Sequence, residues 1–355
     1  IRFLSIDAVQ KANSGHPGMP MGMADVATTL FKYHLRFNPK NPNWINRDRF
    51  ILSAGHGSML LYSLLYLNGY RSITIEDIKN FRQLNSICAG HPEYKKGTGI
   101  ETTTGPLGQG LGNAVGMAIA EEIYKKKFGP TIINNKTYVI ASDGDLMEGI
   151  SHEAMSLAGH LKLKNLIVFF DNNKISIDGS TSLSVSDNYK KRFESYGWNF
   201  LEVNGHNEKQ ISKAISKSTK SSKPTLISCK TIIGFGSPNK SGKASSHGSP
   251  LGDDEIALVR KKLKWSNKPF ETPKEILDEW KKIGEKGEEL EKKWLETINK
   301  KNPKIKSDLE KNYINSDLVE LEKLIEKEKT KYFGTKPSLA TRQCSMAAIE
   351  SISSI

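Results

Sequence analysis

The chain has 355 residues, a formal net charge of +13 and 26% charged side chains, which indicates a folded protein of about two domains. Lysine is concentrated in residues 261–331, where acidic residues are interleaved as on solvated helix faces. No aromatic-interleaved basic patch accompanies it, and we therefore expect no nucleic-acid partner. No apolar run approaches the roughly 18 residues of a membrane span. The three cysteines lack metal-ligand spacing, so the composition favours a cytoplasmic protein without membrane segments, disulfides or zinc.

The first segment that points to chemistry is the glycine-rich stretch 103–110, with the sequence TTGPLGQG. Glycines allow backbone N–H groups to approach an anion closely. The residues that follow, 111–127, have a strongly helical composition. The amino terminus of such a helix carries a partial positive charge, so this stretch predicts a phosphate-binding turn.

A second pair of segments predicts a metal site. Residues 137–141 and 165–170 are short apolar runs typical of buried strands, and a helix is expected over 148–161 between them. This βαβ unit places Asp143, Asn172 and Asn173 at the carboxyl edge of a parallel sheet, where ligands bind. Carboxylate and amide oxygens are hard ligands of the kind that Mg²⁺ prefers.

The eight histidines fall into two groups. His16, His56, His91 and His247 each lie beside glycine or proline in turn-like segments, where loops at a sheet edge build sites, and we expect them to be functional. The other four are expected to be structural or exposed. These are His34, His152, His160 and His206.

These motifs together resemble the transketolase family of thiamine diphosphate enzymes, from residue 1 to about 251 and again near the end of the chain. The resemblance implies an α/β thiamine diphosphate-binding fold, with a mostly parallel sheet flanked by helices. The segments that carry it are 12–18, 52–57, 90–93, 103–110, 142–149, 171–179, 233–236 and 246–248.

The resemblance also implies roles for individual residues. Asp143, the Asn173 side chain and the backbone oxygen of Ile175 would hold Mg²⁺, with Ca²⁺ or Mn²⁺ as alternatives. His16 and His247 would act in catalysis, and both would contact substrate together with His91 and Arg342. The thiamine diphosphate would be lined by Asn173 and His247 together with five further residues, which are His56, Gly105, Pro106, Leu107 and Gly144.

The activity implied is reversible transfer of a two-carbon ketol unit from a ketose phosphate to an aldose phosphate, as in the pentose phosphate pathway or the Calvin cycle. The resemblance places the family's activating glutamate in a second domain, in a part of that domain beyond the residues of this chain. We therefore expect a piece of a longer, homodimeric protein with active sites at the subunit interface, and we expect the piece alone to be inactive.

The expected organisation has three parts. Residues 1–260 form the diphosphate- and metal-binding domain, 261–332 a charged helical linker, and 333–355 the start of a pyrimidine-binding domain that carries Arg342. Two other functions stay open. One is a related thiamine enzyme, such as dihydroxyacetone synthase, deoxyxylulose-phosphate synthase or one subunit of a split transketolase. The other is a fragment that only binds ligand or dimerises, without catalysis.

Overall fold

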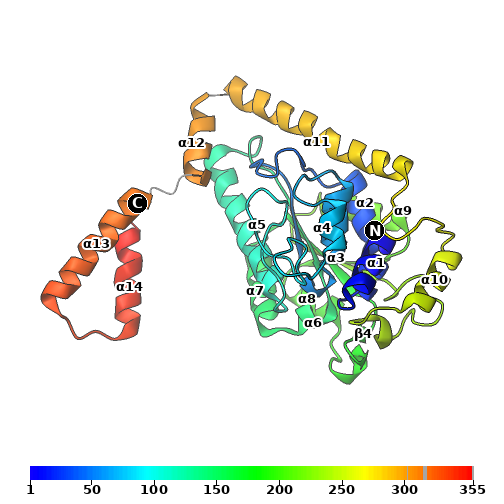
Figure 1. Ribbon diagram of the computed structural model, residues 1–355. Helices are drawn as coiled ribbons and strands as arrows, with labels where there is room; N and C mark the ends of the chain where they lie inside the picture. Colours follow the sequence, from blue (N-terminus) through cyan, green and yellow to red (C-terminus); the bar gives the residue numbers. More distant parts are fainter. Residues whose placement is uncertain (302, 315–317, 354–355) are drawn as a thin grey trace. The chain divides into compact units, whose positions relative to one another are not determined.

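The computed structural model describes residues 1–301, 303–314 and 318–353 (Figure 1). These residues form two compact units, Ile1–Trp294 and Leu295–Ile355. Residues 302, 315–317 and 354–355 belong to the predicted linker and second domain, and they lie outside the described residues. Among the described residues, no helix is long and apolar enough to cross a membrane.

The first unit is built on a five-stranded sheet in which each neighbouring pair is parallel. The strand order is β1-β2-β3-β7-β6, so the chain crosses over between strands and places helices on both faces. All residues of the central strands β2 and β3 are buried, as expected for a parallel sheet covered on both sides. The strands are β1 Arg49–Leu52, β2 Thr137–Ala141, β3 Leu166–Asn172, β6 Asn199–Asn204 and β7 Thr225–Lys230.

The sequence predicted the central βαβ unit closely. Strand β2 has the predicted bounds, β3 extends to Asn172, and helix α7 (Gly149–His160) connects them. One element was missed, because a short helix α6 (Asp143–Met147) follows β2 immediately. Ser142 and Asp145 form a capping box that begins this helix, so Asp143 lies in its first turn. The predicted α/β fold with a mostly parallel sheet is confirmed.

The two faces of the sheet are covered by different helices. Side chains alternate along each strand, so Ile51, Val139 and Val168 join one apolar cluster with helices α5 (Gln109–Phe128) and α7. Neighbouring residues such as Leu52 and Ile140 point to the other face. There they pack with helices α1 Arg2–Ala12, α2 Gly18–Tyr33, α3 Met59–Leu67 and α9 Glu208–Ser218.

The remaining elements of this unit are short and lie mainly in the connections that surround the sheet. They are 3₁₀ helices η1 Gly55–Gly57, η2 Thr181–Leu183 and η3 Ala244–Ser246, helices α4 Ile75–Lys79, α8 Tyr189–Ser195 and α10 Asp253–Lys262, and hairpin strands β4 Ile175–Ser176 and β5 Gly179–Ser180.

Helix α11 (Lys274–Lys301) begins within the first unit and is held there by polar contacts. The Trp294 indole N–H donates to the Ile132 carbonyl at 2.7 Å, and the Glu291 carboxylate accepts from the amides of Asn38 and Asn41. The second unit contains helices α12 Pro303–Ile314, α13 Leu318–Thr335 and α14 Thr341–Ile352, of which α13 and α14 pack together. The functional boundaries at 260 and 332 stay predictions.

Candidate active site

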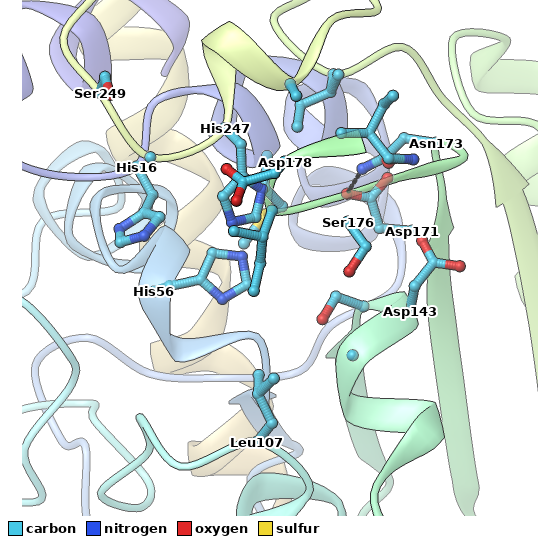
Figure 2. Close-up of a pocket in the computed structure, with 18 of the residues that line it drawn as sticks. His16, His56, Leu107, Asp143, Asp171, Asn173, Ser176, Asp178, His247 and Ser249 are labelled. Atoms are coloured by element: carbon cyan, nitrogen blue, oxygen red, sulfur yellow. Dashed lines mark hydrogen bonds between the residues drawn. The ribbon is translucent and has the colours of Figure 1, made fainter. Parts of the chain in front are cut away.

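A cavity of about 590 Å³ opens at the carboxyl edge of the sheet, in the first unit (Figure 2). It lies where β2, β3 and the loops before α2, α3 and α5 meet, together with the loop that ends in η3. Most of the predicted site residues line it. They are His16, His56, Gly105, Leu107, Asp143, Gly144, Asn173, Ile175 and His247.

Three predicted residues have other positions. His91 is exposed and does not line the cavity, but it lies beside the lining residue Gly105, since a Cβ atom on Gly105 would be 3.3 Å from the His91 ring. Pro106 is next to both lining residues Gly105 and Leu107 but is not itself part of the wall. Arg342 lies on α14 in the second unit, so its predicted contact with substrate stays a prediction.

The oxygen-rich side of the cavity comes from the ends of β2 and β3. The Asn173 amide N–H donates to the Asp171 carboxylate at 2.9 Å, and the Asn173 Oδ1 atom accepts from the Ile175 backbone N–H at 2.8 Å. Asp171 thereby fixes which end of the amide is oxygen. Asn172 instead faces the sheet interior and donates to the Ser228 hydroxyl, so of the two asparagines only Asn173 faces the cavity.

The two carboxylates on this side are poorly compensated. Burial, followed by the negative charge of Asp171, raises the pKa of Asp143 from 3.8 to about 7. Burial also raises the pKa of Asp171 to about 6, although hydrogen bonds from Thr231 and Asn173 oppose that shift. No lysine or arginine is among the described residues that line the cavity. A bound cation would therefore stabilise both ionised carboxylates.

The glycine-rich turn is tied to the same edge by one buried carboxylate, that of Asp145. Its Oδ1 atom accepts from the Gly108 backbone N–H at 2.9 Å and from the Ser53 hydroxyl at 2.8 Å. Its Oδ2 atom accepts from the Ser142 backbone N–H at 2.9 Å. The turn before α5 and the turn after β2 are therefore held together, with Gly108 in a left-handed conformation (φ 80°) that begins α5.

Three histidines form a compact group on the opposite side of the cavity. The ring centroids of His16, His56 and His247 lie 5.1 to 5.4 Å apart. Burial and then the neighbouring His247 lower the pKa of His16 to about 4 and that of His56 to about 3. Burial also lowers the pKa of His247. These rings are therefore neutral near pH 7, and the buried Nδ1 atom of His16 has no hydrogen-bond partner among the residues that the structure describes.

The comparison with known families decides the relationship. Residues 1–317 match the family described as "Transketolase, thiamine diphosphate binding domain". The chain belongs to this family. The transketolase of Buchnera aphidicola subsp. Acyrthosiphon pisum is 59% identical over 304 residues, covering 84% of this chain and 45% of the relative. The transketolase of Sinorhizobium medicae is 49% identical over 352 residues, covering 99% and 50%.

A solved structure supports the same relationship. The transketolase of Campylobacter jejuni superimposes with a TM-score of 0.86 at 45% identity, covering 91% of this chain and 50% of that chain. The chain thus spans about half the length of the transketolases that it matches. The relationship to the transketolase family, inferred from the motifs, is confirmed.

The cavity fits the cofactor that the transketolase family uses, thiamine diphosphate with a divalent metal. Asp143, Asn173 Oδ1 and the Ile175 carbonyl are hard oxygen donors on one side of the cavity, next to the Asp171 carboxylate. Among the described residues, no group of three or more His, Cys, Asp or Glu side chains could hold a metal ion. A metal site with a single carboxylate ligand, completed by diphosphate oxygens, does not require such a group. Gly144 keeps the wall open, since a Cβ atom there would lie 2.8 Å from Leu107 Cδ1.

Several residues that shape this site were not assigned a role from the sequence. Asp171 orients Asn173, Asp145 joins the two turns, and Thr231 donates its hydroxyl proton to Asp171. Asp171 directly follows the predicted strand 165–170, and Asp145 lies four residues after the predicted strand 137–141, so both were visible in the sequence as acidic residues near strand ends. Thr231 carries no such signal, because its partner lies 60 residues earlier in the chain.

Proposed function

We propose that this chain is the cofactor-diphosphate part of a transketolase, which reversibly transfers a two-carbon ketol unit from a ketose phosphate to an aldose phosphate. The observation that carries the proposal is the pairing, in one cavity, of an oxygen-donor edge with a cluster of neutral histidines. Bound thiamine diphosphate would supply the electron sink that makes cleavage of the carbon–carbon bond accessible.

The oxygen-donor edge is proposed to hold the metal and the diphosphate. Asp143, Asn173 and the Ile175 carbonyl would bind Mg²⁺, and the charge of the cation would return the pKa of Asp143 toward its ordinary range. The glycine turn and the amino terminus of α5 would bind phosphate oxygens through backbone N–H groups. Gly105, Pro106, Leu107, Gly144 and His56 are the residues proposed to line the cofactor.

The histidine cluster is proposed to bind the sugar and move its protons. A neutral imidazole can donate to one hydroxyl and accept from another, and the unpartnered Nδ1 atom of His16 is available for such a bond. His16 and His247 would transfer protons to and from the reacting carbon and oxygen atoms. His91 would contact sugar hydroxyls, and Arg342 would bind the substrate phosphate through its planar guanidinium.

The protein partner that we propose is a second copy of the full chain. Ile150, Leu157 and Leu161 follow one side of α7 at positions i, i+7 and i+11, and they are 42%, 46% and 45% exposed. Helix α5 packs beside α7 and adds Ile123, which is 59% exposed. An apolar face of this kind is typical of a subunit interface. We propose a cytoplasmic homodimer with sugar phosphate substrates, with the active site completed by residues beyond this chain.

The deciding experiment is a coupled ketol-transfer assay on the full-length protein with xylulose 5-phosphate and ribose 5-phosphate. We expect turnover only when thiamine diphosphate and Mg²⁺ are both present, and loss of turnover on chelation. Formaldehyde as acceptor tests for dihydroxyacetone synthase, and pyruvate with glyceraldehyde 3-phosphate tests for deoxyxylulose-phosphate synthase. The proposal would be overturned by a folded full-length protein that binds the cofactor but acts only with formaldehyde as acceptor, or only on pyruvate with glyceraldehyde 3-phosphate.

A further inference from the structure

His206 lies outside the cavity, yet its two ring nitrogens connect two parts of the fold. The Nδ1 atom lies 2.8 Å from the Asp25 carboxylate on α2, and the Nε2 atom accepts from the Ile232 backbone N–H at 3.1 Å. A backbone N–H can only donate, so Nε2 carries no proton and Nδ1 carries the one that Asp25 accepts. One neutral tautomer of His206 therefore satisfies both partners.

The ring of His206 is held in place by further contacts. It stacks on Phe235 with ring centroids 4.1 Å apart, and the Arg2 guanidinium lies 4.6 Å from the centre of the same Phe235 ring. Arg2 also pairs with Asp25 at 2.6 Å. The His206 side chain is only 14% exposed. Its two hydrogen bonds are thus fixed in geometry, and Phe235 and Ile232 both belong to the segment that it holds.

The segment held by His206 forms a wall of the cavity. Ile233 lines the cavity, and the Gly234 N–H donates to the Gly18 carbonyl at the start of α2. Space there is limited, because a Cβ atom on Gly18 would lie 2.6 Å from Ile233 Cγ1 and 2.4 Å from the Ser246 carbonyl. Ser246 directly precedes His247. A Cβ atom on Gly234 would lie 2.7 Å from Ser246 Oγ, so we expect movement of the segment to shift His247 relative to His16.

We propose that His206, oriented by Asp25, is a positioning residue that fixes the 231–236 segment and, through it, the His247 side of the cavity. His206 touches neither the cavity nor the proposed substrate, and it acts by supplying the one acceptor that the Ile232 N–H uses. The effect of His206 on catalysis rests on the proposed function. Its role in holding the conformation of the 231–236 segment does not depend on that function.

The test measures hydrogen exchange at the Ile232 amide in the full-length protein without added cofactor. His206→Phe keeps an aromatic ring beside Phe235 but removes the acceptor, and we expect exchange to accelerate about tenfold or more, as for the loss of one hydrogen bond. His206→Asn retains a polar group at the Nδ1 position only and should behave like the phenylalanine variant. His206→Gln returns an oxygen near the Nε2 position, and exchange should stay within about threefold of the native rate.

His34→Phe is the matched control, since it removes a histidine contact between α2 and α9, to Ser212, without touching the segment. Its Ile232 exchange should be native. Tryptic cleavage after Lys240 and Lys243 should rise in the phenylalanine and asparagine variants and stay native in the glutamine variant. Unchanged exchange in His206→Phe, or equal acceleration in His206→Gln, would overturn the proposal.

The same variants separate this proposal from the proposed function. If the full-length protein catalyses ketol transfer, kcat/KM should fall in His206→Phe and recover in His206→Gln. If it has no ketol transfer but shows the expected exchange pattern, the positioning role stands and only the proposed function fails.

Discussion

Asp143→Asn should make the metal-free protein more stable and the metal site non-functional. The asparagine keeps the size of the side chain but removes a charge that the fold disfavours, since Asp143 is only 3% exposed and its pKa is raised from 3.8 to about 7. A group with a raised folded-state pKa contributes stability that is present below its unfolded pKa and lost as pH rises through the folded value. The loss of folding stability that comes from ionising buried Asp143 is therefore small near pH 4 and reaches its full value above pH 7.

The magnitude follows from the shift. At about 1.4 kcal/mol per pKa unit, a shift of about 3 units corresponds to a penalty of about 4 kcal/mol at pH 8 and about 1.5 kcal/mol at pH 5. The asparagine amide must still be buried, so we expect a net gain of about 2 kcal/mol at pH 8 and little gain at pH 5. Urea unfolding of the full-length protein in EDTA at both pH values measures this difference.

The same variant should lose Mg²⁺-dependent binding of thiamine diphosphate, measured by calorimetry, because the cation loses its only charged ligand from the protein. Asp178→Asn is the matched control: Asp178 lines the same cavity but is exposed, so we expect little change in stability at either pH. The reasoning is refuted if Asp143→Asn is less stable than the native protein at pH 8, or if its gain is equal at pH 5 and pH 8. Retained metal-dependent binding would refute the ligand assignment.

Three further outcomes are expected. The contribution of His16 to native stability should fall as pH drops from 6.5 toward 4, because the unfolded chain binds a proton at this histidine that the folded chain does not, so His16→Gln should gain stability relative to the native protein over this range in pH-dependent urea unfolding. Gly144→Ala should leave the fold intact but weaken cofactor binding about tenfold in a fluorescence titration, because the added methyl group displaces Leu107. Native affinity in this variant would show that Leu107 can move aside without affecting the site. Leu157→Lys should convert the full-length dimer to monomer in light scattering, whereas Leu84→Lys, on an exposed loop, should leave it dimeric.

The parts of the fold that the sequence predicted are those with a local signal. The bounds of β2 were correct because five consecutive apolar or β-branched residues followed by Asp143 and Gly144 favour a short buried strand, which places Asp143 close to its end. Helix α5 was identified from composition to within two residues at its start and one at its end. The clustering of His16, His56 and His247 was expected from turn-like surroundings and from the family resemblance.

The parts that escaped prediction depend on partners that are distant in the chain. His206 was expected to be structural or exposed, and nothing adjacent to it indicates Asp25, which lies 181 residues earlier. Asp171 begins the 171–179 motif, but the sequence does not show that one of its oxygens accepts from Asn173 while the other accepts from Thr231. Long-range polar contacts of this kind leave no periodic pattern in a single sequence.

The buried carboxylate of Asp145 links several turns on one side of the cavity, so residues on the two sides of the cavity differ in how independently they can be substituted. It joins the Gly108 turn, Ser53 and Ser142 on the side proposed to hold the diphosphate, so we expect a change at one of these turns to affect the others. The histidines opposite come from three separate loops, before α2, before α3 and after η3. If these histidines bind the sugar as proposed, a change in one of the loops can alter substrate preference while the turns proposed to hold the diphosphate stay as they are.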